Sequence, residues 1–511
     1  MSELFLHYEK VNPTTWVYLS SFLIIGLYFK FNRFWSVRNL DVILLILFAP
    51  GLVLVHLGQQ EQLTARSLVM ELEQGGQEQP GREEVPTGGE AAASRTSAPR
   101  SLLLPGNRGT SSDSSTDSDA ESVEVQRQLI TDRMVYAQRL QRRGFIWLMV
   151  IGGLFVVRLL FDPTMVRRPL LDPNLSLGGL TFIGLSLFVF LVVNVMIAGR
   201  PLPGEEMNSG AAVSLPQQPM ASQSSDIRQG PGYSLLERVP SVPIMPWRAD
   251  DILQKQPVDY SLSRLLVILS HLAIVLGMVA IGYWHFENIK TGIGAATLYL
   301  ILPYTAQMGG RVDHAFPAAM LIWAIVFYRR PLVSGAILGF SACIYYPLFL
   351  LPLWISYYSQ RGLFRFLAGV TTSLTILALL LYFNTANSQD FIAELRRMFG
   401  LMTPRMDHLQ GIWMLGWDPA FRLPVMTAFF ALSATLALWP AQKNLGTLMS
   451  CSAALLVATR FWNGNGGGLY MGWYLPLILI TVFRPNLEDR LAITVLSPGW
   501  ARNRRTLSHN D

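Results

Sequence analysis

Charged residues are scarce in this chain, making up 14% of its 511 residues, whereas soluble proteins average about 25%. The hydrophobic share, 51%, is only slightly above the usual value. These residues gather, however, in runs of 15 to 20 between positions 15 and 484. Such runs exclude a soluble enzyme and a disordered chain, and they indicate helices that cross a lipid bilayer.

Cysteine is almost absent: the chain has two, Cys343 and Cys451, and both lie inside apolar runs. A disulfide-rich secreted domain and a cysteine metal site are therefore excluded, because buried thiols behave as small hydrophobes. The sequence also lacks GxSxG, HExxH, paired CxxC and kinase motifs. No Lys/Arg block is long enough for a nucleic-acid-binding arm. We expect no metal, no cofactor and no nucleic-acid partner.

The apolar runs predict an all-α, polytopic integral membrane protein with about 12 transmembrane helices in a cell membrane, inner or plasma. Pro347 and Pro352 favour a break of the run 331–358 into two short helices, because proline removes a backbone donor. With that run, the predicted spans are 15–30, 40–57, 145–161, 178–198, 264–284, 291–305, 314–328, 363–383, 422–440, 444–461 and 469–484.

Two polar linkers divide the chain. Their cores are rich in Gly, Ser, Pro and acidic or amide residues, a composition that cannot bury enough surface to offset the entropy of ordering, so we predict disorder there. The expected segments are a two-span region 1–57, a linker 58–143 ending in a juxtamembrane helix, a two-span region 144–199 with a polar loop, a disordered linker 200–260, a multi-span module 261–486 and a basic tail 487–511.

Basic residues between the later spans indicate an orientation. If 331–358 forms two short helices, the basic groups of the last connectors fall on one side, which we assign to the cytoplasm. The loops 306–313, 384–421 and 460–468 then face outward together. These basic groups are Arg329 with Arg330, Arg361 with Arg365, Lys443, and the tail from Arg484.

The polar loop 158–176 is the first candidate site. Asp162 and Asp172 flank the pair Arg167 and Arg168. A carboxylate beside arginines can act as a general base next to a phosphate clamp, since guanidinium groups match phosphate oxygens. The alternative is an interfacial loop that sets topology, with each Asp-Pro starting a turn.

The turn 307–316 is the second candidate. Gly309 and Gly310 allow a tight turn that brings Arg311, Asp313 and His314 together at a helix start. Histidine has a pKa suited to proton transfer near neutral pH. The alternative is an ordinary turn in which Asp313 is the N-cap.

Two outward loops complete the candidates. Trp413 and Trp417 lie beside polar residues in 384–421 and would suit a sugar face, although interfacial tryptophan anchors are the alternative. The glycine-rich stretch within 458–476 fits neither the Walker A nor the dinucleotide-binding pattern, so it is either a phosphate-approaching loop or a plain connector.

The stretch from about Arg264 to Gly369 resembles the central part of the C-type polytopic glycosyltransferases, particularly mannosyltransferase-like members that use polyprenyl-phosphate sugars. It holds GIGAATLYLILP, a polar turn with Asp, YRRP, and SGAILGFSACIYYPLFLLPLW, while LYMGWYLPLILI near 469–480 resembles the late helix of that family. Tyr345 stands where many members carry a basic residue. The corresponding residues are Pro303, Asp313, Gly335, Gly339, Tyr345, Tyr346 and Pro347.

The resemblance implies an inverting transfer of a sugar from a lipid-linked phosphate donor. The family's catalytic carboxylate lies in the first external loop, which here matches Asp162 or Asp172. We expect Asp162 as the base, with Asp313, Asp172 and His314 as alternatives. The phosphate would be held by Arg167, Arg168 and Arg311, beside the sugar face of Trp413 and Trp417.

The expected partners are membrane lipid and the lipid-linked donor, and the oligomeric state is not indicated. The competing hypothesis is a non-enzymatic membrane protein, a scaffold or transporter-like protein, whose linkers recruit partners.

Overall fold

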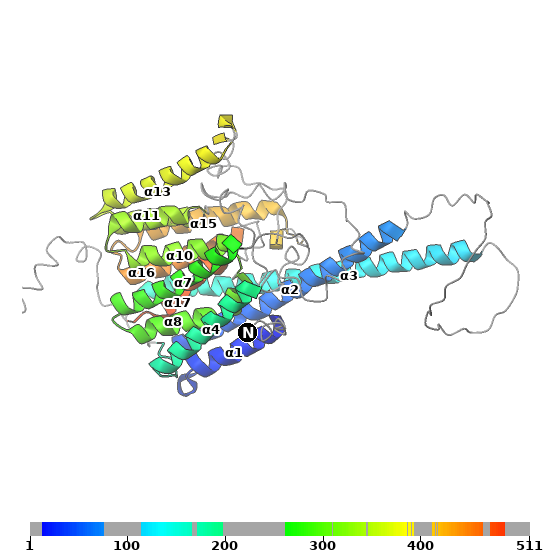
Figure 1. Ribbon diagram of the computed structural model, residues 1–511, viewed down its shortest axis with the longest axis horizontal. Helices are drawn as coiled ribbons and strands as arrows, with labels where there is room; N and C mark the ends of the chain where they lie inside the picture. Colours follow the sequence, from blue (N-terminus) through cyan, green and yellow to red (C-terminus); the bar gives the residue numbers. More distant parts are fainter. Residues whose placement is uncertain are drawn as a thin grey trace, which may run out of the picture. The chain divides into compact units, whose positions relative to one another are not determined.

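Every regular element in the described part of the chain is a helix (Figure 1). The computed structural model describes residues 13–75, 114–165, 171–197, 261–308, 310–343, 346–385, 387–389, 391–392, 411–413, 415, 417–462 and 471–485. The α-helices are α1 Pro13–Tyr28, α2 Val37–Gly75, α3 Ser114–Phe161, α4 Leu177–Ile197, α7 Ser261–Trp284, α8 Ile289–Ile301, α9 Pro303–Met308, α10 Val312–Val326, α11 Pro331–Ser341, α12 Leu351–Tyr358, α13 Leu363–Asn384, α15 Arg422–Leu438, α16 Leu445–Trp462 and α17 Leu475–Phe483. Short 3-10 helices are η2 Phe31–Arg33, η3 Asp162–Thr164, η7 Tyr346–Leu350, η8 Gly411–Trp413, η9 Pro419–Phe421 and η11 Met471–Trp473.

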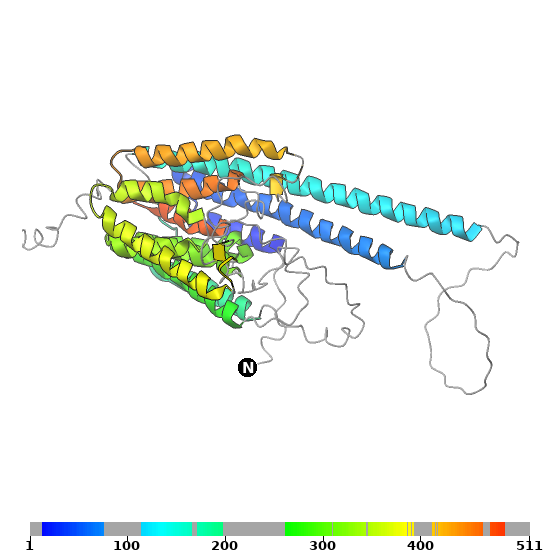
Figure 2. The same cartoon turned by 90° about the horizontal axis from the view of Figure 1, so that it is seen from above.

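The chain divides into two compact units, one of residues 1–56 with 141–511 and the other of residues 57–140. In the larger unit the helices run side by side (Figures 1 and 2). In the smaller unit, parts of α2 and α3 lie together and bury Ala65, Ile130 and Ala137. The cores of the predicted disordered linkers and the basic tail lie outside the described residues.

In the described part of the chain, seven helices are long and apolar enough to cross a membrane: α2, α3, α4, α7, α13, α15 and α16. The chain is therefore an all-helical membrane-embedded protein, as predicted, but twelve full spans are not confirmed. Four expected spans correspond to shorter apolar helices, namely α1, α8, α10 and α11. With 13 residues, α8 rises only about 20 Å, less than the roughly 30 Å hydrocarbon layer.

Proline explains several of these short helices. Pro303 follows the end of α8, and the run 331–358 is divided into α11 and α12 with η7 between them. Helices too short to span lipid must be covered by protein. Every residue of α17 is buried, and so is every residue of the adjoining α16 except Phe461.

The connectors with the later basic residues meet at one end of the larger unit, called here the Asp162 end. Lys443 Nζ donates to Ser356 Oγ at 3.0 Å, and the Tyr358 hydroxyl donates to the Tyr328 carbonyl oxygen at 2.7 Å. Arg484 binds Asp162 itself. The broken run 331–358 thus returns the chain to the same end, which is the arrangement that the basic pattern requires.

Small residues let α11 and α13 approach closely. Within membranes, helix association depends on such close packing, because lipid tails are as apolar as the side chains. A Cβ added at Gly339 would lie 2.8 Å from the Ser373 Cβ, and one added at Gly335 would collide with the Phe366 carbonyl oxygen. Ser373 Oγ also donates to the Ala336 carbonyl oxygen at 2.7 Å.

Gly369→Ala should therefore lower the thermal stability of the protein. Its Cβ would collide with the Leu332 carbonyl oxygen and lie 2.7 Å from the Ala336 nitrogen, and overpacking of this kind costs about 1–3 kcal/mol. The measurement is the thermal unfolding midpoint in detergent. Gly178→Ala is the matched control, because nothing lies within 4 Å of its added Cβ; equal midpoints for both variants would contradict the prediction.

Candidate functional site

Interrupted helices meet around Trp473, at the end of α17 opposite the Asp162 end; this region is called here the Asp313 end. The Trp473 indole Nε1 donates to the Asp313 carbonyl oxygen at 3.1 Å. The Tyr346 ring lies 4.8 Å from the Trp473 ring and 6.0 Å from the Trp462 ring. Irregular backbone at membrane depth is tolerated only where protein buries it or where it lines a cavity. The breaks thus mark the place where a polar site can exist inside the bundle.

Arg311, Asp313 and His314 are brought together as the sequence suggested. Arg311 donates a hydrogen bond to each carboxylate oxygen of Asp313, with Nε–Oδ1 at 3.0 Å and Nη2–Oδ2 at 2.6 Å. The His314 Nε2 lies 3.7 Å from Asp313 Oδ2. The Asp313 side chain is 15% exposed, whereas that of His314 is 3% exposed. The bidentate geometry fixes the direction of the carboxylate.

Asp313 is not the N-cap of α10, because Arg311 occupies that position without a side-chain cap bond. The carboxylate instead lies in the first turn, where the helix dipole stabilises negative charge.

A small cavity adjoins His314. Its volume is about 10 Å³, close to the room that one water needs. The lining includes His271, Tyr304, His314 and Gly472. Inside the bundle, the His271 Nδ1 and Tyr299 hydroxyl are 2.8 Å apart. Residues 393–410 and 463–470 lie outside the described residues, so the lining is given for the described residues alone.

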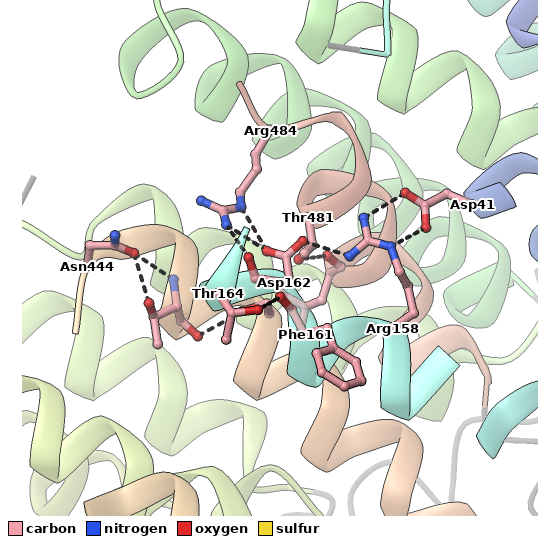
Figure 3. A network of polar contacts seen from close by, with 11 residues as sticks. Asp41, Arg158, Phe161, Asp162, Thr164, Asn444, Thr481 and Arg484 are labelled. Atoms are coloured by element: carbon pink, nitrogen blue, oxygen red, sulfur yellow. Dashed lines mark hydrogen bonds and ion pairs between the residues drawn. The ribbon is translucent and has the colours of Figure 1, made fainter. Parts of the chain in front are cut away.

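Asp162 lies elsewhere, in a buried chain of charges (Figure 3). Arg158 bonds Asp41 through Nε–Oδ1 at 2.7 Å and Nη2–Oδ2 at 2.8 Å, and it bonds Asp162 Oδ1 through Nη1 at 2.9 Å. Arg484 donates a hydrogen bond to the other carboxylate oxygen of Asp162, with Nη2–Oδ2 at 2.7 Å. Two carboxylates and two guanidinium groups therefore alternate and balance in charge.

This charge network joins α2, α3, η3 and the residue after α17. Asp162 is fully buried, and both of its carboxylate oxygens accept from guanidinium groups. The arrangement suits a structural tie better than a base that receives a proton from a substrate.

Asp172 shares the Asp162 end rather than the Asp313 end. Its carboxylate pairs with Lys290 at 2.7 Å on a half-exposed surface, and its carbonyl oxygen accepts from Arg38. Arg167 and Arg168 lie outside the described residues. Asp162 and Asp313, the two carboxylates expected first as the base, do not share a site, because the nine-residue α17 separates them by a rise of about 13 Å.

Trp413 and Trp417 form an edge-to-face pair with ring centroids 6.2 Å apart. Trp413 is 4% exposed and Trp417 is 43% exposed. Only Trp417 therefore offers an accessible ring for a sugar or a lipid headgroup.

Sequence reasoning missed three charged residues inside the bundle: Asp41, Arg158 and Arg460. Each is an isolated charge in or beside an apolar run, and a charge at membrane depth is a functional candidate by default. The isolated charges could therefore have been identified from the sequence. The pairing of Asp41 with Arg158 could not, because the two residues are 117 positions apart.

Fold and site together define a polytopic helical membrane protein with a polar cluster among broken helices. Comparison with protein-family models gives no match. Comparisons with curated proteins and with solved structures also give none.

Proposed function

We propose that the chain transfers a sugar from a lipid-linked phosphate donor to an acceptor hydroxyl at the Asp313 end, in an inner or plasma membrane. The observation that carries the proposal is the Asp313 carboxylate itself. It is partly exposed, held in one direction by Arg311, and set among interrupted membrane helices. With the basic connectors at the Asp162 end in the cytoplasm, the Asp313 end faces outward.

In this proposal Asp313 is the general base of an inverting transfer. Its carboxylate accepts the proton of the acceptor hydroxyl while that oxygen bonds to the anomeric carbon. The bond from that carbon to the phosphate oxygen breaks, and the lipid phosphate leaves with the electron pair. A positioned base contributes about 10²–10⁴-fold to such a step.

The geometry favours Asp313 over Asp162 for this role. Asp313 keeps 15% of its side chain exposed, whereas Asp162 has none exposed and lies between Arg158 and Arg484. Arg311 forms an ion pair with Asp313, so its role in this proposal is to orient the base. A different cation would then have to bind the phosphate.

The test is transfer by the purified full-length protein in vesicles that contain a radiolabelled polyprenyl-phosphate sugar. We expect the label to move to an added acceptor glycan or glycolipid. When the same sugar is supplied on a nucleotide instead, we expect no transfer. An absence of transfer with several lipid-linked sugars and acceptors would contradict the proposal.

The breaks in the helices also favour a second candidate, a transporter-like protein. Discontinuous helices at membrane depth form the substrate sites of many transporters. Uptake of a labelled solute by sealed proteoliposomes, without chemical change to it, would favour this candidate over the transferase.

A further inference from the structure

Arg460 carries a buried charge that no carboxylate in the described part of the chain neutralises. It lies in α16, two residues before the end of the most deeply buried long helix. The residue is 3% exposed, and among the described residues no carbonyl or carboxylate oxygen accepts from its Nη1 and Nη2 atoms. Burying a charge without a partner is costly, so such groups are normally paired.

Aromatic and glycine residues surround this guanidinium. Its Cζ atom lies 6.0 Å from the centre of the Phe48 ring, which is stacked on Phe155 at 5.2 Å. On α3, a Cβ added at Gly152 would be 3.9 Å from Nη1. A ring face attracts the cation, but it does not supply the in-plane acceptors that the guanidinium N–H groups need.

Two buried tyrosine hydroxyls, those of Tyr304 and Tyr474, belong to the same polar group as Arg460. The Tyr474 hydroxyl interacts with the Arg460 guanidinium and can accept a hydrogen bond from it. Tyr304 interacts electrostatically with both Tyr474 and Arg460. Within the described part of the chain, the Tyr304 hydroxyl has no hydrogen-bond partner. Tyr304 also lines the small cavity beside His314, which connects this group to the Asp313 end.

A tyrosine hydroxyl can accept one guanidinium N–H but carries no charge, so no anion in the described part of the chain balances Arg460. The segment that follows α16, NGNGGGLY at 463–470, contains no acidic residue. Asp313 is held by Arg311 at 2.6 Å. A guanidinium fork with two adjacent hydroxyl donors matches the oxygens of a phosphoryl group.

We propose that Arg460, Tyr304 and Tyr474 form a binding site for the phosphoryl group of a membrane lipid. The position of Arg460 within a membrane-spanning helix favours a lipid-borne phosphate over a soluble one. The inference deepens the proposed function, because the donor's phosphate would be the occupant. Binding can nevertheless be measured without an acceptor, so its failure is distinct from a failure of transfer.

The experiment compares ligand-dependent stability in a phosphate-free detergent such as dodecyl maltoside. Full-length protein is washed extensively and its thermal unfolding midpoint is measured with farnesyl phosphate, farnesol or inorganic phosphate. We expect farnesyl phosphate to raise the midpoint by several degrees, because a ligand that binds only the folded state stabilises it. Farnesol should give no comparable rise. If inorganic phosphate also raised the unfolding midpoint, the result would support the same site, occupied by phosphate from the aqueous solution.

Arg460→Met is expected to abolish the rise caused by farnesyl phosphate, with an affinity at least tenfold weaker. Without ligand, its unfolding midpoint should equal or exceed that of the wild type, because the variant removes an unpaired buried charge. Arg460→Gln is the second variant, in case methionine disturbs folding. Tyr474→Phe should reduce the rise, whereas Tyr358→Phe, whose hydroxyl is bonded at the Asp162 end, should keep it.

A lipid that remains bound after washing would hide the rise in midpoint. Native mass spectrometry of the washed proteins detects such a lipid. A phosphorylated lipid retained by the wild type and lost from Arg460→Met would support the site. The site would be overturned if Arg460→Met retained the lipid as the wild type does, or if farnesyl phosphate raised its unfolding midpoint equally. It would also be overturned if the wild type showed neither bound lipid nor a rise in midpoint. Normal sugar transfer by Arg460→Met would separate the two proposals, leaving the transferase without this site.

Discussion

Arg158→Met should destabilise the protein by about 3–5 kcal/mol, the usual cost of removing one partner from a buried ion pair. Arg158 is 10% exposed and holds Asp41 with two bonds and Asp162 with one. Its removal leaves Asp41, 3% exposed, without that bidentate cation. Because these groups join α2, α3 and η3, the loss should affect the larger unit as a whole.

Lys290→Met is the matched control for this prediction. It also removes one cation from an ion pair, but Lys290 and Asp172 are 32% and 49% exposed. Exposed pairs contribute about 0–1 kcal/mol, so this variant should unfold nearly as the wild type does. Unfolding in mixed micelles with increasing denaturing detergent gives the comparison. Equal stability of the two variants would show that the charge network is not a structural tie.

On the proposed function, Asp313→Asn should lower the rate of sugar transfer by about 10²–10⁴-fold, because an amide cannot accept the proton of the acceptor hydroxyl. The expected loss is in kcat, with little change in the KM for the lipid donor, since the substitution keeps the shape of the side chain. Folding should be preserved, because the carboxylate is partly exposed and its main partner, Arg311, is also partly exposed.

Asp162→Asn gives the opposing pattern and separates the two carboxylates. It should reduce the yield and stability of folded protein, since Arg484 and Arg158 lose a charged partner. The transfer rate per folded molecule should remain near that of the wild type. A full loss of activity in a stable Asp162→Asn variant, with activity retained in Asp313→Asn, would reverse the assignment.

The position of most helices could be predicted from hydrophobic runs, because the hydrocarbon layer requires long apolar stretches with internally bonded backbones. The expected spans 178–198 and 363–383 correspond to α4 and α13. Lengths were less predictable. The expected span 469–484 contains a helix of nine residues, α17, which is tolerated because surrounding protein covers it.

The site could be predicted only where its residues are neighbours in the chain. Arg311 and Asp313 are two positions apart, so a local turn is enough to bring them together. The role of Asp162 depended on Arg484, which is 322 positions away. No periodicity or spacing reports a contact of that range.

The sequence by itself determined that this chain is a helical membrane protein, because its charge is sparse and its apolar runs are continuous and long enough for helices, which satisfy their own backbone groups in lipid. It also determined that Arg311, Asp313 and His314 start one helix. Only the tertiary structure decided which charges are neutralised. Ion pairing depends on distance across helices. In the described part of the chain, the packing binds Asp162 on both sides but brings no carboxylate to the guanidinium of Arg460.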